Sequence, residues 1–159
     1  MSELGIEKPT RETDEEEQIA HLMQELLAGL PEGTATLGVR HDRSGTVFHL
    51  KPANKKSADL GIHYDGCVDV FFGSFGTTFG LPYESGLPRH ADFEATLSWA
   101  KAIGLAVIAG KCKERAGFFG VRGTVEVNGK AYGVSNFFHL RLFPKTFHYA
   151  PYCLKEAGR

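Results

Sequence analysis

Histidine and aspartate gather around one predicted turn, and these residue types bind metal ions or transfer protons. His63, Asp65 and Asp69 lie within a few residues of one another, and neutral imidazole and carboxylate are both good metal ligands. Asp65-Gly66 is typical of a two-residue hairpin turn. With that turn, strand alternation places His63 and Asp69 on opposite faces of the sheet. We therefore expect no metal site, with Asp65 as a turn residue and Asp69 as a surface or capping carboxylate.

Cysteine could supply a nucleophile if a histidine lay beside it. Cys67, Cys112 and Cys153 show no paired spacing of the kind that zinc sites use. Cys112 has cationic neighbours at Lys111 and Lys113, and nearby cations lower a thiol pKa. No flanking signature supports a Cys–His pair, so we interpret Cys67 as a small buried strand residue and Cys112 as an incidental residue near a helix end. An odd number of unpaired cysteines favours a reducing cytoplasm.

A glycine- and phenylalanine-rich run, FFGSFGTTFG at residues 71–80, is the most unusual stretch of the chain. Glycine allows backbone angles that other residues avoid, and each phenylalanine carries apolar surface that something must cover. The run therefore predicts a strand that continues into an irregular, aromatic loop. In one interpretation the loop lines a groove for a ligand or partner, with polar anchors on its rim; the residues are Phe75, Phe79, Tyr83, Glu84 and Arg89. In the other, the aromatic rings fold inward and cover the open end of the sheet.

Two further stretches carry possible binding chemistry. His139 and Arg141 share a face by strand alternation, and with Arg122 they could receive a carboxylate, although a solvated sheet face has the same composition. Residues 115–121, RAGFFGV, resemble in composition the aromatic strand motif of RNA-recognition domains. The order of glycine and aromatic residues differs from that motif. A formal net charge of −1 also argues against nucleic acid as a partner.

Length and composition are those of one ordinary globular domain. The chain has 159 residues, of which 42% are apolar and 23% charged, the balance expected of a soluble protein. The longest apolar run, residues 105–109, is too short to cross a bilayer, so we expect no membrane association. The polar residues 1–12 predict a flexible N-terminal tail, and residues 13–159 a single domain.

Two helices are predicted. Thr13 and Glu16 form a capping-box pattern, after which apolar residues recur at helical spacing, namely Ile19, Leu22, Met23, Leu26, Leu27 and Leu30. A second helix is expected from Asp92 as the N-cap, with Gly104 weakening its middle or ending it early.

The remaining elements are strands joined in hairpins. Three pairs are predicted, the last around Asn128-Gly129, a preferred two-residue turn: Thr34–Arg40 with Thr46–Lys51, Ala58–Tyr64 with Cys67–Phe72, and Phe118–Val127 with Lys130–Leu140. Residues 142–159 are expected to pack along the surface without forming a helix. The prediction is an α+β fold with a largely antiparallel sheet of about six strands and two helices, in the order αββββαββ.

These features favour a non-enzymatic cytoplasmic module that binds a protein partner through the aromatic, glycine-rich loop. Its general character is similar to that of small bacterial inhibitors of toxins, including immunity proteins. The alternative is a small enzyme or ligand-binding protein, with a pocket formed by the loop and by polar groups near His63, Asp65 or Asp69. No assembled catalytic, cofactor or metal motif is present in the sequence, so we predict no cofactor and no metal.

Overall fold

The computed structural model describes residues 10–81, 89–136 and 143–153 of the chain. These residues form two helices and nine strands. In chain order the elements are α1 (Thr10–Ala28), β1 (Ala35–Asp42), β2 (Gly45–Pro52), β3 (Leu60–Tyr64), β4 (Val68–Phe72), β5 (Thr77–Leu81), α2 (Arg89–Ile108), β6 (Cys112–Gly117), β7 (Gly120–Val127), β8 (Lys130–Asn136) and β9 (Lys145–His148). Neither helix is long and apolar enough to cross a membrane.

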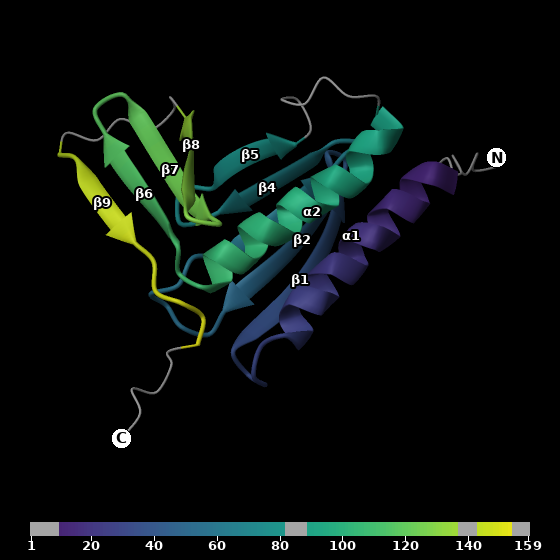
Figure 1. The fold of residues 1–159 in the computed structure, drawn as a ribbon, viewed down its shortest axis with the longest axis horizontal. Helices are drawn as coiled ribbons and strands as arrows, with labels where there is room; N and C mark the ends of the chain where they lie inside the picture. Colours follow the sequence, from purple (N-terminus) through teal and green to yellow (C-terminus); the bar gives the residue numbers. More distant parts are fainter. Residues whose placement is uncertain (1–9, 82–88, 137–142, 154–159) are drawn as a thin grey trace, which may run out of the picture.

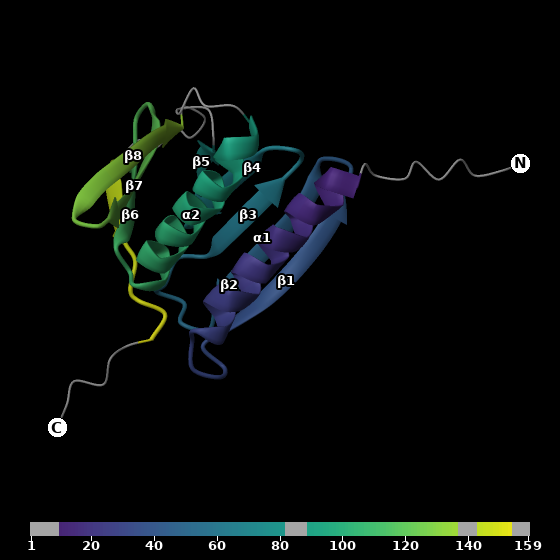
Figure 2. The ribbon, with the colours of Figure 1, turned by 45° about the vertical axis from the view of Figure 1, so that its right-hand side comes forward.

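The strands form two antiparallel sheets instead of the single sheet expected. The first sheet has the order β1-β2-β3-β4-β5, and the second has the order β8-β7-β6-β9. Helices α1 and α2 lie side by side across one face of the first sheet, and the second sheet stands at the far end of the molecule from α1 (Figures 1 and 2). The α+β class is confirmed. The predicted six strands were too few because β5, β6 and β9 were not anticipated.

One hydrophobic core joins the helices to both sheets. Helix α1 contributes the predicted apolar face, in which Ile19 and Met23 are fully buried. Phe72 and Val70 of β4 fill the centre of the first sheet, and Val125 of β7 extends the same core into the second sheet. The core therefore holds the second sheet in place against the rest of the fold.

Both helices begin earlier than the sequence predicted. Helix α1 begins at Thr10, so Thr13 lies inside the helix and is not its cap, and α2 begins at Arg89, before Asp92. Residues 1–9 of the predicted flexible tail lie outside the described residues.

Gly104 does not end α2 as predicted. A Cβ added there would lie 2.8 Å from Leu26 Cδ1 of α1 and 3.3 Å from Leu60 Cδ2 of β3. This glycine therefore permits the close approach of α2 to its neighbours.

Of the two predicted two-residue turns, the structure confirms the one at Asn128-Gly129 and corrects the one at Asp65-Gly66. Asn128 and Gly129 have φ of 51° and 77°, and Val127 pairs with Lys130, so the predicted two-residue turn with positive φ is confirmed. The turn at Asp65-Gly66 holds three residues, because Tyr64 pairs with Val68. That single extra residue shifts the register of β4 by one and exchanges its two faces.

Residues 143–153 pack along the surface and include a strand; residues 154–159 of the predicted segment lie outside the described residues. Strand β9 pairs antiparallel with β6. Beyond it, Pro151 O accepts a hydrogen bond from Ser57 Oγ at 2.9 Å, and Tyr152 N donates to Ile108 O at 2.9 Å. The buried Tyr152 hydroxyl donates to Ala58 O at 2.8 Å. These contacts fix the position of β9 at the edge of the second sheet.

The Asn128-Gly129 turn predicts the effect of a single substitution. Gly129→Val should lower the free energy of unfolding by about 1–3 kcal/mol, because a β-branched residue resists positive φ. Urea unfolding followed by circular dichroism measures the change. Ala131→Val, at an exposed strand position of β8, is the matched control and should be nearly neutral. Equal stability of the two variants would contradict the turn.

Candidate binding surface

The glycine- and aromatic-rich run at residues 71–80 is not the irregular loop that the sequence predicted: it holds the end of β4, a turn at residues 73–76 and most of β5. The turn and the first residue of β5, which we continue to call the loop, are held by a buried carboxylate. Glu114 of β6 has no exposed surface. Its Oε1 accepts hydrogen bonds from Thr77 Oγ1 at 2.6 Å and from Thr77 N at 3.3 Å, while Oε2 accepts from Phe75 N at 3.3 Å. Burying a carboxylate is costly unless donors satisfy it. The loop supplies those donors, so loop and carboxylate stabilise each other.

Glycine at position 73 is required by this arrangement. Its φ is +81°, and an added Cβ would lie 2.5 Å from Glu114 Cδ and 2.8 Å from Oε1. Opposite Glu114 in the sheet register, Gly123 of β7 leaves room for Thr77, whose Cγ2 would lie 2.0 Å from a Cβ there. Two glycines on separate elements thus make space for the Glu114–Thr77 contact.

Tyr149 closes the same cluster from the C-terminal side. Its hydroxyl donates to Glu114 Oε2 and accepts a hydrogen bond from Ser74 N at 2.8 Å. Burial, together with the bond to Glu114, raises the pKa of Tyr149 to about 12. The phenol therefore remains protonated at neutral pH and acts as a donor. The cluster ties β6, the loop and the segment after β9 together.

The structure places the five predicted loop residues in different settings. Phe75 is half-buried, and its ring meets the edge of Phe147 of β9 at a centroid distance of 5.4 Å. Phe79 stacks on Phe72 at 6.1 Å and packs against the core. Tyr83 and Glu84 lie outside the described residues, and Arg89 is the first residue of α2, with a side chain that is not described.

Exposed aromatic rings gather at one end of the second sheet. Phe118 and Phe119 form the turn between β6 and β7 and are 51% and 83% exposed. Phe143, also 83% exposed, lies at the same end, because Lys145 two residues later pairs with Ala116. Large apolar side chains this exposed are typical of interaction sites. The sequence predicted Phe118 and Phe119 as the first residues of a strand, whereas the structure places both in the turn before β7.

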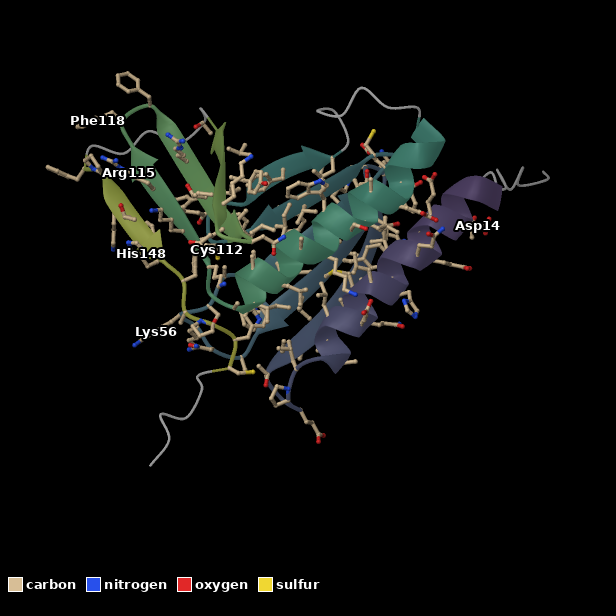
Figure 3. The ribbon with its side chains drawn as sticks, in the orientation of Figure 1. Asp14, Lys56, Cys112, Arg115, Phe118 and His148 are labelled. Carbon is tan, nitrogen blue, oxygen red and sulfur yellow. The ribbon has the colours of Figure 1, made fainter. Side chains whose placement is uncertain are left out.

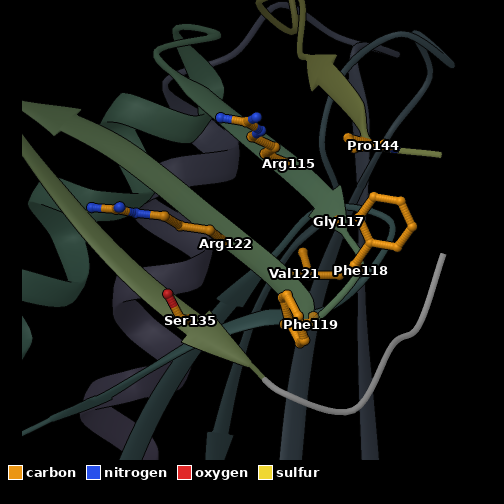
Figure 4. Close-up of a pocket in the computed structure, with 9 residues that line it drawn as sticks. Arg115, Gly117, Phe118, Phe119, Val121, Arg122, Ser135 and Pro144 are labelled. Atoms are coloured by element: carbon orange, nitrogen blue, oxygen red, sulfur yellow. The ribbon is translucent and has the colours of Figure 1, made fainter. Parts of the chain in front are cut away.

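A cleft of about 330 Å³ lies beside these rings. It combines both aromatic residues of the turn with two arginines and a hydroxyl, and we call it the sheet-end cleft; its residues are Arg115, Gly117, Phe118, Phe119, Gly120, Val121, Arg122, Ser135 and Pro144. Figure 4 shows the guanidinium groups of Arg115 and Arg122 extended in the same direction from neighbouring strands, with Phe118 and Phe119 toward the turn. Figure 3 places Arg115, Phe118 and His148 at the opposite end of the molecule from Asp14 of α1.

Of the cationic patch predicted from Arg122, His139 and Arg141, the structure describes only Arg122. Arg122 lies directly opposite Arg115 of β6 in the sheet register, a neighbour that the sequence interpretation did not include. His139 and Arg141 lie outside the described residues. The patch that the structure describes is therefore built from β6 and β7.

His63 and Asp69 lie on the same face, so the prediction of opposite faces was wrong. The three-residue turn makes them direct partners across β3 and β4. His63 Nδ1 lies 3.7 Å from Asp69 Oδ2, and Nε2 lies 2.8 Å from Ser44 O. Asp65 accepts a hydrogen bond from Cys67 N at 3.2 Å, as a turn residue does. Within the described ranges, no group of three or more His, Cys, Asp or Glu side chains is placed to hold a metal ion.

Cys112 is less reactive than its neighbours in the sequence indicate. It follows the end of α2 at Ile108, as predicted, but it is the first residue of β6 and is buried, and alternation turns the Lys113 side chain to the other face. Burial, with a smaller contribution from the charge of Glu114, raises the pKa of the thiol to about 12. A protonated, buried thiol is a poor nucleophile.

One arrangement has the residue types of a nucleophile with a base. Thr46 Oγ1 donates to Glu16 Oε1 at 2.6 Å, and His41 Nδ1 lies 2.9 Å from the same hydroxyl. Thr46 is only 1% exposed, however, and its proton is directed to the carboxylate. A substrate could not reach this hydroxyl, so the arrangement stabilises the contact between α1 and β2.

A comparison of the chain with protein-family models, curated proteins and solved structures finds no significant match.

The Glu114 cluster predicts that two loop glycines respond differently to substitution. Gly73 and Gly76 both have positive φ, but a Cβ at Gly76 would meet nothing within 4 Å. Gly76→Ala should cost about 1–2 kcal/mol from backbone strain alone. Gly73→Ala should cost at least about 2 kcal/mol more, because the carboxylate must move and lose donors. Chemical denaturation measures both, and equal costs would show that Glu114 does not hold the loop.

The raised pKa of Tyr149 predicts a pH dependence of stability. A group whose pKa is raised on folding stabilises the fold fully below its unfolded pKa, about 10 for tyrosine, and loses that contribution as pH rises through its folded pKa. For Tyr149 the window runs from about pH 10 to about pH 12. Tyr149→Phe should therefore destabilise the protein by about 1–3 kcal/mol at pH 8, with the difference shrinking above pH 10. Denaturation of both proteins between pH 8 and pH 11.5 measures it, and a constant difference would contradict the role of the hydroxyl.

Proposed function

We propose that the protein is a non-enzymatic binding module that recognises a protein partner. The observation that carries the proposal is the sheet-end cleft, in which two exposed phenylalanines lie beside two arginines. Aromatic residues and arginine are the types most enriched at the energetically important centre of protein interfaces. An inhibitor or immunity-type role in the cytoplasm is one form that such a module takes.

The glycine- and aromatic-rich loop belongs to the same proposal in a supporting role. Its backbone is fixed by Glu114, and Phe75 packs on Phe147 of β9, the strand that borders β6. A fixed loop loses little conformational freedom on binding, which favours affinity. Phe75 then contributes a half-buried ring at the edge of a preformed surface.

A small-ligand or catalytic role has weaker support. Such a role needs ionisable groups that face an enclosed cavity and remain available to a ligand. Among the described residues, the most buried carboxylate, Glu114, already accepts hydrogen bonds from the loop and from Tyr149. His63 is likewise held by Ser44 O and Asp69.

A capture experiment with matched variants tests the proposal. The immobilised protein is incubated with lysate of the source cells, and the proteins it retains are identified. Phe118→Ser combined with Phe119→Ser should abolish capture of the partner, because truncating an anchoring aromatic commonly costs about 2 kcal/mol or more of binding. Leu105→Ser, which alters a half-exposed residue of α2, is the control and should retain the partner.

Thermal stability separates binding from folding in this experiment. The double variant should melt within a few degrees of the wild type, since both rings are exposed. Capture that is unchanged in the double variant, or lost equally in the Leu105→Ser control, would contradict the proposal.

A further inference from the structure

The outer face of the second sheet carries cations in register. Because Cys112, Glu114 and Ala116 of β6 are buried, the residues between them, Lys113 and Arg115, point to the opposite face. Both are exposed. The burial of β6 therefore determines which of its side chains reach solvent.

Two rows of side chains cross this face. In the first, Arg115 lies between Thr146 of β9 and Arg122 of β7, and Ser135 of β8 follows Arg122. In the second, Lys113 lies between His148 of β9 and Thr124 of β7. We call this surface the cationic face, defined by Lys113, Arg115 and Arg122, with His148 beside Lys113.

The arginine pair concentrates positive charge on this face. Like charges directly opposite in a sheet destabilise it, and within the described ranges no carboxylate forms an ion pair with Arg115 or Arg122. Glu126 lies farther along β7, next to the Asn128-Gly129 turn and away from the sheet-end cleft. The cations and exposed aromatics thus share one end of the face. A bound anion would offset the cost of the pair, since two adjacent guanidiniums suit a carboxylate.

We propose that the cationic face binds an extended acidic segment of the protein partner. Carboxylates of the segment pair with Arg115 and Arg122, and an adjoining apolar residue packs on Phe118 and Phe119 in the sheet-end cleft. The proposal rests on the proposed function, which makes the partner a protein, and adds the chemistry that the partner presents.

The spacing of the cations favours an extended segment with alternate acidic residues. Lys113 and Arg115 are two residues apart on one face of β6, which is about 6.6 Å in a strand. An extended peptide with acidic residues at positions i and i+2 repeats at the same distance and presents both carboxylates on one side. An apolar residue two positions farther on would reach Phe118.

Charge and ring placement favour a peptide over a single-stranded nucleic acid. Nucleic-acid binding requires a broad basic field along the backbone, whereas this chain has a formal net charge of −1. Base stacking on a sheet uses aromatic rings that stand on the strands. Phe118 and Phe119 lie in the turn between β6 and β7, and the strand positions beside Arg115 and Arg122 hold Thr146 and Ser135.

Fluorescence anisotropy with a defined peptide tests the proposal. The probe is a labelled seven-residue peptide with glutamate at three alternate positions followed by leucine, and the comparison peptide has glutamine in place of each glutamate. We expect the acidic peptide to bind at least tenfold more tightly than the glutamine peptide. Arg115→Gln and Arg122→Gln should each weaken binding at least tenfold, while Lys51→Gln, at an exposed position of β2 in the first sheet, should leave it unchanged.

The melting temperature provides a second readout. Neither arginine variant should melt below the wild type, because removing one of two opposed like charges relieves repulsion. Weakened binding together with a lowered melting temperature would show that the arginines support the fold, and would overturn the proposal.

Two controls separate this inference from the proposed function. Binding that Arg115→Gln and Arg122→Gln leave unchanged, or tighter binding of a labelled oligothymidylate, would overturn the acidic-segment proposal. If capture from lysate still depends on Phe118 and Phe119 in that case, the protein-binding function stands with a partner of different chemistry. If capture from lysate does not depend on Phe118 and Phe119 either, the acidic-segment proposal and the proposed protein-binding function are both wrong.

Discussion

The position of the second sheet against the loop depends on one buried carboxylate. Glu114 accepts hydrogen bonds from Thr77, the Phe75 backbone and Tyr149, and so joins β6, the loop before β5 and the segment after β9. No other described side chain connects three segments so distant in the sequence through an ionisable group that is completely buried. A buried charge whose donors are removed is strongly destabilising, so this contact requires all three segments to adopt their positions together.

The same carboxylate determines what the opposite face of β6 presents. A strand alternates, so a buried Glu114 requires exposed side chains at Lys113 and Arg115. Register with β7 then brings Arg115 opposite Arg122. The alternation of β6 therefore places Glu114, which holds the loop, on the inner face and the cationic face on the outer one. A partner bound on the outside, as proposed, would contact a strand whose position is already fixed from the inside, which would limit the conformational entropy lost on binding.

Local patterns predicted the elements that are defined by local physics. The apolar spacing of α1 and the Asn128-Gly129 turn followed directly from residue type, and the antiparallel α+β class followed from hairpins between neighbouring strands. The register at Asp65-Gly66 did not follow, because two-residue and three-residue turns share glycine and aspartate, and only tertiary packing selects between them. Strand β9 was missed because it pairs with β6, which is distant from it in sequence. Strand β6 was missed because charged residues interrupt its apolar pattern.

The contacts that build the candidate site were also beyond local sequence patterns, because they join residues distant in the sequence. The sequence predicted that the glycines of residues 71–80 belonged to an irregular aromatic loop, either exposed or folded over the core, whereas Gly73 is required for the close approach of a carboxylate from residue 114. The signal for that carboxylate was present, since Glu114 occupies the apolar side of an alternating strand between Cys112 and Ala116. A charge on the buried side of a strand requires donors from elsewhere, and the backbone amides of Phe75 and Thr77 supply them here. A polar residue that breaks an apolar face is thus a better guide to long-range structure than an aromatic-rich loop, because it specifies what its partner must supply.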